Sequence, residues 1–322
     1  MALKHLRNGV AVGQSTHKPP YAQRHTLLIT MDRNSYDNGI LEDPEDSREE
    51  FRKLSSQRAP EPDALNRYFT NKLYQAVYGS NKIDNVGGDL DVTIKLCRSV
   101  FEGKTTDSDD LWSLSAQGYR DIVQHVKAGL YIFGEITNGD LSEAMILETH
   151  RILVNGIDIK ERTLAAEYSG RYRQCPAQTL FRQLMHEKQV PSAMKQMIAS
   201  YKADVLAAAK KGEIDPVALA AKYCHIFVNI HPFVDGNGRM SRLILNAILF
   251  KFAGCLIAFG QDESDKALYL GVALSGSLWV TANKVKELGD LPKEPMSKNH
   301  GKLASFTLKH ALESMQEICD LK

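Results

Sequence analysis

The chain has 322 residues, of which 43% are hydrophobic and 25% charged, as in an ordinary globular protein. Its formal net charge is +1, which gives no sign of steering toward nucleic acid or a membrane, and no long basic block appears. We therefore expect no nucleic-acid partner and no membrane partner.

The five cysteines are odd in number, and no pair has the Cys-x-x-Cys spacing. This favours reduced thiols in a reducing compartment over a disulfide framework. The amino-terminal stretch lacks an apolar signal core, so we expect a cytoplasmic or nuclear protein. The longest apolar stretch, residues 243–260, contains Asn246 and Lys251 and predicts a buried helix followed by a loop.

Residues 1–61 form a polar segment with an acidic cluster at 42–46. Such a composition buries little surface, and we predict an extended arm that is partly disordered or wrapped on the body. The short apolar run at residues 26–30 is the part of this arm that would dock, as a strand or a clip.

Residues 62–139 predict a helical region. Apolar side chains recur at helical spacing from Pro62 to Val77, and two or three further helices are predicted between 90 and 130. The first helix ends at Ser80–Asn85, before a glycine-rich turn. By itself this segment is an ordinary helix end rich in Asn and Gly.

Residues 140–286 predict the main helical domain. Amphipathic helices are expected at 141–153, whose His150 we interpret as structural, and at 190–206. Asp215 and the proline after it start a helix that is apolar nearly all round, which is typical of a buried central helix.

The helical pattern fails between Tyr168 and Thr179. Gly170 and Pro176 break a helix there, and Tyr172 and Thr179 suit short strands, so this stretch predicts a surface β-hairpin.

Residues 287–322 predict a proline-containing linker and a last amphipathic helix at 303–318. That helix either caps the core or forms a dimer contact, so a homodimer stays open.

The most informative stretch is His231-Pro-Phe-Val-Asp-Gly-Asn-Gly-Arg-Met-Ser-Arg242, followed by an apolar run. A glycine-rich turn that leads into a helix is an anion site, because the backbone N–H groups point outward and the helix dipole favours negative charge. Gly236, Asn237 and Gly238 would supply those N–H groups.

Arg239, Arg242 and Asn246 lie at positions i, i+3 and i+7, on one face of the predicted helix. Guanidinium groups bind phosphate oxygens in pairs. Asp235 offers one hard oxygen ligand for a Mg²⁺ held largely by substrate phosphates, and His231 suits proton abstraction at neutral pH. Each residue alone has a structural interpretation, as a buried histidine, a turn or a solvated face; the combination favours a site.

This stretch resembles the signature of the Fic family, H-x-F-x-[DE]-G-N-G-R-x-x-R, at every fixed position. The resemblance implies an all-α fold, a Fic-type helical bundle with a small β-hairpin flap over the active site. It implies a protein adenylyltransferase that moves AMP from ATP to a Ser, Thr or Tyr hydroxyl of a target protein, releasing pyrophosphate, with Mg²⁺. His231 would be the general base, Asp235 the metal ligand, and Asn246 a nucleoside contact.

Two further stretches gain meaning from this resemblance. Ser80, Asp84 and Asn85 resemble the family's inhibitory motif [ST]-x-x-x-E-[GN], whose acid pairs with the second arginine of the signature. Asp84 stands where Glu is usual, and the shorter acid needs a helix about 1 Å closer to Arg242 or a bridging water.

The hairpin stretch is similar to the family's flap, which binds the target by main-chain pairing. The implied flap residues are Arg173, Gln174, Cys175, Pro176, Ala177, Gln178 and Thr179. Tyr269 falls near the place of a tyrosine that the family uses against the nucleotide base, although core packing fits it equally well.

Three alternatives remain. A family branch that transfers phosphate has Lys at the position of Gly238, so Gly238 favours AMP transfer. Removal of AMP from a modified protein, alone or in a bifunctional enzyme, is the closer rival. A catalytically silent nucleotide-sensing adaptor is the third, and the intact His231 argues against it.

Overall fold

The computed structural model describes residues 27–37, 39–41, 43–104, 114–159, 163–179, 182–284 and 300–321. The predicted all-α class is confirmed. The described helices are α2 (Pro44–Ser55), α3 (Pro62–Ile83), α4 (Leu90–Glu102), α5 (Ala116–Asn138), α6 (Glu143–Leu153), α7 (Ala165–Tyr168), α8 (Val190–Lys211), α9 (Pro216–Ile230), α10 (Asn237–Phe252), α11 (Glu263–Lys284) and α12 (Gly301–Cys319). Short 3-10 turns lie at Arg33–Ser35 and Glu187–Gln189.

Strands are few and short in the described part of the chain. β1 (Leu28–Ile29) pairs in parallel with β4 (Glu213–Ile214), and β2 (Gln178–Thr179) pairs antiparallel with β3 (Arg182–Gln183). The second pair is a hairpin that lies later than the predicted stretch, because its first strand begins only at Gln178 and Tyr172 is not in a strand. Among the described helices, none combines the length and the hydropathy needed to cross a bilayer.

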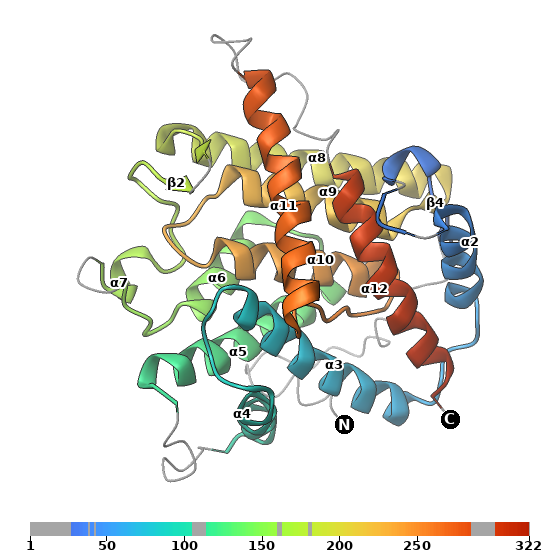
Figure 1. Ribbon diagram of the computed structural model, residues 1–322, viewed down its shortest axis with the longest axis horizontal. Coiled ribbons are helices and arrows are strands. Elements are labelled where there is room, and N and C mark those ends of the chain that lie inside the picture. Colours follow the sequence, from blue (N-terminus) through green and yellow to red (C-terminus); the bar gives the residue numbers. More distant parts are fainter. Residues whose placement is uncertain are drawn as a thin grey trace.

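Helix α9 lies at the centre, packed against α8, α10, α11 and α12 (Figure 1). The side chain of Asp215 caps it by accepting a hydrogen bond from the backbone N–H of Ala218, and Pro216 occupies its first position. Its residues are buried on nearly all faces, as its sequence predicts. The central burial of α9 holds the residue at its carboxyl end, His231, in a fixed place.

The amino-terminal segment differs from the predicted extended arm. Residues 44–55 form α2, because Asp43 caps the backbone N–H groups of Glu45 and Asp46. Phe51 and Leu54 of this helix are buried, and α2 packs against α12. The acidic cluster that suggested an arm is therefore a helix start, where acidic side chains favour the dipole. The expected docking of residues 26–30 is seen as β1, while residues 1–26 lie outside the described part.

Helix α12 packs against α2 and α9 within the chain, with Phe306, Leu308 and Ala311 fully buried. This is the core-capping alternative for the last helix. The predicted linker before it, residues 288–299, lies outside the described residues.

Two glycines permit a close approach of α3 to the loop before α11. A Cβ on Gly79 would lie 2.0 Å from the carbonyl oxygen of Phe259, and one on Gly260 would lie 2.6 Å from Ile83. Gly260 also has a positive φ of 77°. This contact fixes the carboxyl end of α3, which carries Ser80 and Asp84.

Replacing Gly79 by alanine is expected to lower the free energy of unfolding by more than about 2 kcal/mol, because the clash is with backbone. Gly134 is the matched control, since it lies inside α5 and a Cβ there meets nothing within 4 Å. Gly134→Ala should stabilise the chain by about 0.5–1 kcal/mol. Denaturant unfolding of both variants measures this, and equal effects would contradict the close packing.

Asp215 connects the amino-terminal segment to α9 by accepting hydrogen bonds from the Tyr36 hydroxyl and the Asp32 backbone. Burial raises the pKa of Asp215 from 3.8 to about 6. A raised acid pKa means that the folded state binds the proton more tightly, so stability falls as pH rises through this window. The free energy of unfolding of the wild type, minus that of Asp215→Asn, should therefore decrease as pH rises from 3.8 to about 6. A flat difference in denaturation experiments would contradict it.

Candidate functional site

The loop between α9 and α10 carries the signature residues and is held by side chains on both sides. His231 ends α9 in the left-handed conformation, with a φ of 52°. The side chain of Asn237 accepts a hydrogen bond from the N–H of Phe233 at 2.9 Å and donates one to its carbonyl at 2.8 Å. Gly236, with a φ of 76°, turns the chain into α10. The predicted turn into a helix start is therefore present.

His150 of α6 supports this loop from behind. Its Nε2 lies 3.1 Å from the carbonyl oxygen of Asp235, while its Nδ1 accepts a hydrogen bond from the N–H of Gly170 at 2.9 Å. The ring stacks on Phe233 with centroids 3.6 Å apart. Burial lowers the pKa of His150 to about 4, so the ring is neutral and Nε2 carries the hydrogen that it donates to Asp235. The structural interpretation of His150 thus holds, with a specific contact behind it.

Arg242 reaches the carboxyl end of α3. Its Nη2 lies 2.8 Å from a carboxylate oxygen of Asp84, and its Nε donates to the hydroxyl of Ser80 at 2.7 Å. The shorter acid therefore pairs directly, and the anticipated bridging water is not needed. Gly238 makes the approach possible, since a Cβ there would lie 3.2 Å from both Asp84 and Arg242. Asn85 accepts a hydrogen bond from Lys266 of α11 at 2.7 Å.

Arg239 meets three carboxylates. Its Nη1 lies 2.8 Å from Asp121, its Nη2 3.2 Å from Asp235, and its Nε 3.8 Å from Asp84. Sequence reasoning missed Asp121. The signal that could have found it is an acid next to Ile122 on the buried side of α5. A buried acid requires a buried cation as its partner, and the arginines of the signature are candidates for that cation.

Two predicted nucleotide contacts lie elsewhere than anticipated. The amide of Asn246 is buried and makes hydrogen bonds in both directions with the backbone of Ile257, at 2.8 and 3.1 Å. Its side chain therefore braces the loop after α10 instead of facing an open site. Tyr269 is 5% exposed and packs on Phe259 and Phe306, with the guanidinium of Arg242 5.7 Å from its ring. This is the core-packing alternative.

A hairpin is present, but its strands lie later than predicted, at Gln178–Thr179 and Arg182–Gln183, so most of the predicted flap residues precede it, and Arg173 does not face outward. It is 2% exposed, and its side chain donates to the carbonyl oxygens of His231 at 2.8 Å, Cys175 at 3.0 Å and Met185. Its backbone N–H also donates to Pro232 at 2.9 Å. Arg173 ties the base of the hairpin to the signature loop, and its guanidinium is committed to those carbonyls. The exposed neighbours are Gln174, Cys175 and Pro176, followed by the half-buried Ala177 and by Gln178 and Thr179 in β2.

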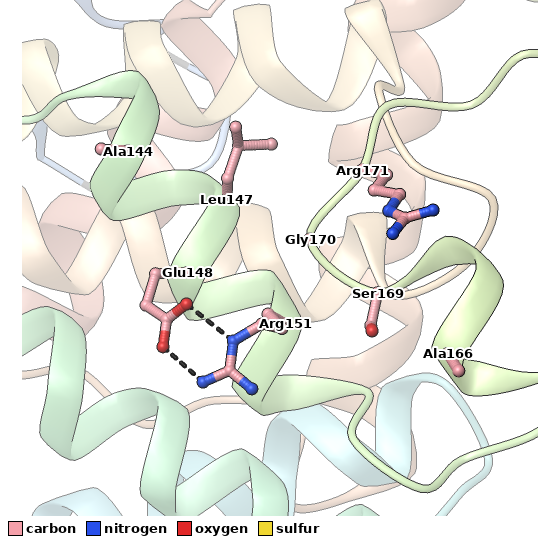
Figure 2. Close-up of a pocket in the computed structure, with 8 residues that line it drawn as sticks. All are labelled: Ala144, Leu147, Glu148, Arg151, Ala166, Ser169, Gly170 and Arg171. Atoms are coloured by element: carbon pink, nitrogen blue, oxygen red, sulfur yellow. Dashed lines mark hydrogen bonds and ion pairs between the residues drawn. The ribbon is translucent and has the colours of Figure 1, made fainter.

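An open pocket of about 440 Å³ lies beside this region (Figure 2). Leu147, Glu148 and Arg151 of α6 line one side, and the chain at residues 169–171 lines the other. Glu148 and Arg151 pair with each other along α6, on the same wall of the pocket. The signature residues do not line this pocket. The pocket is linked to their loop through Gly170, which lines it and donates a hydrogen bond to His150.

Taken together, the fold and the site define a helical protein whose glycine-rich helix start, two arginines and histidine form one constellation. Residues 140–249 match the model of the Fic/DOC family. The chain is 26% identical over 282 residues to the protein adenylyltransferase Fic of Nematostella vectensis, covering 85% of this chain and 59% of that protein. It is 57% identical over 58 residues to a Fido domain-containing protein of Dictyostelium discoideum, covering 17% of this chain and 41% of that one.

Solved structures share the fold. A Fic domain containing signaling protein from Bacteroides thetaiotaomicron superposes with a TM-score of 0.63 at 22% identity, covering 84% of this chain and 93% of that chain. Fic-1 from C. elegans superposes with a TM-score of 0.60 at 20% identity, covering 85% and 70%. The chain thus spans less than two thirds of the length of the two curated relatives above.

Proposed function

We propose that this chain transfers AMP from ATP to a Ser, Thr or Tyr hydroxyl of a target protein and releases pyrophosphate. The observation that carries the proposal is the single loop from His231 to Gly236, which leads into α10 with Arg239 and Arg242 in its first turns. The match to the Fic/DOC family and the relatives named protein adenylyltransferase Fic support it.

In the proposed reaction, His231 removes the proton of the target hydroxyl. The hydroxyl oxygen attacks the α-phosphorus, the bond to the bridging oxygen breaks, and pyrophosphate leaves. The backbone N–H groups at the start of α10 and the guanidinium groups of Arg239 and Arg242 bind the phosphate oxygens. The contribution of the protein is mainly positioning and stabilisation of charge.

Asp235 is the residue that would hold Mg²⁺. Its carboxylate is 46% exposed, beside the glycine turn, and it forms an ion pair with Arg239. A single accessible carboxylate fits an ion that takes its other ligands from substrate phosphates and water. When bound, Mg²⁺ would neutralise charge on the phosphates.

The same geometry supports autoinhibition. Asp84 occupies the guanidinium of Arg242 and lies against Gly238, so a phosphate that binds there has to displace a carboxylate. Removal of AMP from a modified protein is the second candidate, and it rests on the same observation, because this carboxylate is close enough to the loop to orient a water molecule.

The proposed partner is a protein segment that pairs with the hairpin β2–β3 by strand addition. A homodimer and a cytoplasmic or nuclear location stay predictions.

The test is incubation with Mg²⁺ and ATP labelled at the α-phosphate or, in parallel, at the γ-phosphate. Label from the α-position alone, on this chain or on a protein of a lysate, supports AMP transfer. Label from the γ-position would indicate phosphate transfer. No label with bound ATP would favour the silent adaptor, and loss of AMP from a modified protein would favour AMP removal.

A further inference from the structure

Asp121 is a buried acid on α5 that lies far from the signature in sequence but contacts it. It is 2% exposed, and its carboxylate accepts a hydrogen bond from Nη1 of Arg239 at 2.8 Å. Burial raises the pKa of Asp121, and the charge of Arg239 opposes this shift. The arginine therefore favours the ionised form of this carboxylate, against the effect of burial.

The contacts of Arg239 are unevenly distributed around its guanidinium. Asp121 takes Nη1, whereas the edge formed by Nε and Nη2 faces the loop. Nη2 lies 3.2 Å from Asp235, and the buried Nε has no hydrogen-bond partner among the described residues; the nearest carboxylate oxygen, on Asp84, is 3.8 Å away. An unpaired buried donor is unfavourable, so this edge is suited to an incoming pair of anionic oxygens.

Asp121 also belongs to a contact between α5 and α3. The side chain of Asn81 donates to the backbone carbonyl of Asp121 at 3.4 Å and accepts from Nδ1 of His125 at 2.7 Å. Burial, together with the charges of Arg239 and Arg242, lowers the pKa of His125 well below its ordinary value, so the ring is neutral. The α5 surface around Asp121 is thus rigidly packed and shielded from water, as a support for an arginine requires.

We propose that Asp121 is a positioning residue, which holds the guanidinium of Arg239 so that Nε and Nη2 face an anion at the start of α10. The inference rests on the proposed function in taking this anion as the triphosphate of ATP. Asp84 and Asp235 are the other two acids at this arginine, and both change partners when a nucleotide and Mg²⁺ bind. Asp121 keeps its contact throughout.

One consequence concerns Mg²⁺. When Asp121 is replaced by asparagine, the charge of Arg239 is balanced by Asp235 and Asp84 alone. Arg239 then competes with Mg²⁺ for Asp235. Asp121→Asn should therefore weaken binding of ATP with Mg²⁺ by about tenfold and raise the Mg²⁺ concentration for half-maximal binding several-fold.

The decisive experiment is a double-mutant cycle of Asp121→Asn and Arg239→Lys, in which the affinity for ATP with Mg²⁺ is measured by calorimetry. All four proteins carry His231→Asn, so that no transfer occurs. If Asp121 acts through Arg239, the double variant binds no more weakly than the weaker single variant. Effects that multiply would overturn the inference.

Ser314→Ala, which removes a buried hydroxyl bonded to Leu256, is the control for general core damage and should leave the Mg²⁺ requirement unchanged. A Mg²⁺ requirement shifted equally by this control would overturn the inference.

A second measurement does not depend on how the variants fold. In a crystal of the wild type with ATP and Mg²⁺, Nη1 of Arg239 should still contact Asp121 while Nε or Nη2 contacts a phosphate. A guanidinium that has left Asp121 would overturn the inference, as would an absence of ATP binding. Non-additive binding in the cycle, combined with no transfer of AMP by the protein that retains His231, would instead contradict only the proposed function.

Discussion

Replacing His231 is expected to reduce the proposed AMP transfer by at least about 100-fold, because histidine is the residue of the loop whose ordinary pKa suits a general base at neutral pH. The choice of substitution matters, since residue 231 has a φ of 52°. Alanine is strained in this conformation, whereas asparagine tolerates it. His231→Asn therefore removes the base with less change to the loop, and His231→Ala serves as the harsher comparison. The measurement is the initial rate of labelling from ATP with Mg²⁺.

Binding of ATP provides the control for this prediction. The phosphates are assigned to the start of α10, so His231→Asn should keep the affinity for ATP within about threefold of the wild type. A variant that transfers AMP as fast as the wild type would remove the general-base role. A variant that loses both transfer and ATP binding would show that His231 maintains the loop.

Replacing Asp84 by glycine is expected to increase both the affinity for ATP and the rate of labelling. The carboxylate of Asp84 lies 2.8 Å from Arg242, and its removal leaves that guanidinium with the hydroxyl and carbonyl of Ser80. A phosphate would then meet a cation that is no longer neutralised. We expect the affinity for ATP and the rate of labelling to increase by at least about tenfold.

Two matched variants separate charge from bulk at this position. Asp84→Asn keeps the size of the side chain beside Gly238 but removes its charge, so an intermediate increase is expected. Asp84→Glu keeps the charge, and labelling should stay low. If Asp84→Gly leaves both ATP affinity and labelling unchanged, the contact with Arg242 is structural and the inhibitory role is wrong.

The sequence was sufficient wherever the relevant contacts are local. The turn from His231 to Gly238, the helix that follows it and the cap of α9 at Asp215 depend on residues within a few positions of one another. The central burial of α9 followed from its apolar composition alone. The interruption of the helical pattern at Gly170 and Pro176 could also be predicted, but the strands of the hairpin lie later, at Gln178–Thr179 and Arg182–Gln183.

The acidic cluster at residues 42–46 shows where composition misleads. Polar composition suggested an extended arm, yet Asp43 is a helix cap, and α2 packs against α12 with Phe51 and Leu54 buried. Propensity scales average over such a segment, whereas a cap acts at one position.

What only the tertiary structure decided is which distant side chains meet the loop. Asp121 is 118 positions from Arg239, Ser80 is 162 from Arg242, and Arg173 is 58 from His231. The outward or inward direction of Arg173, Asn246 and Tyr269 was equally undetermined. The physical reason is that a hydrogen-bond pattern along one helix constrains neighbours three or four residues away, whereas contacts between helices depend on how their faces pack. Close approaches such as the one at Gly79 set that packing.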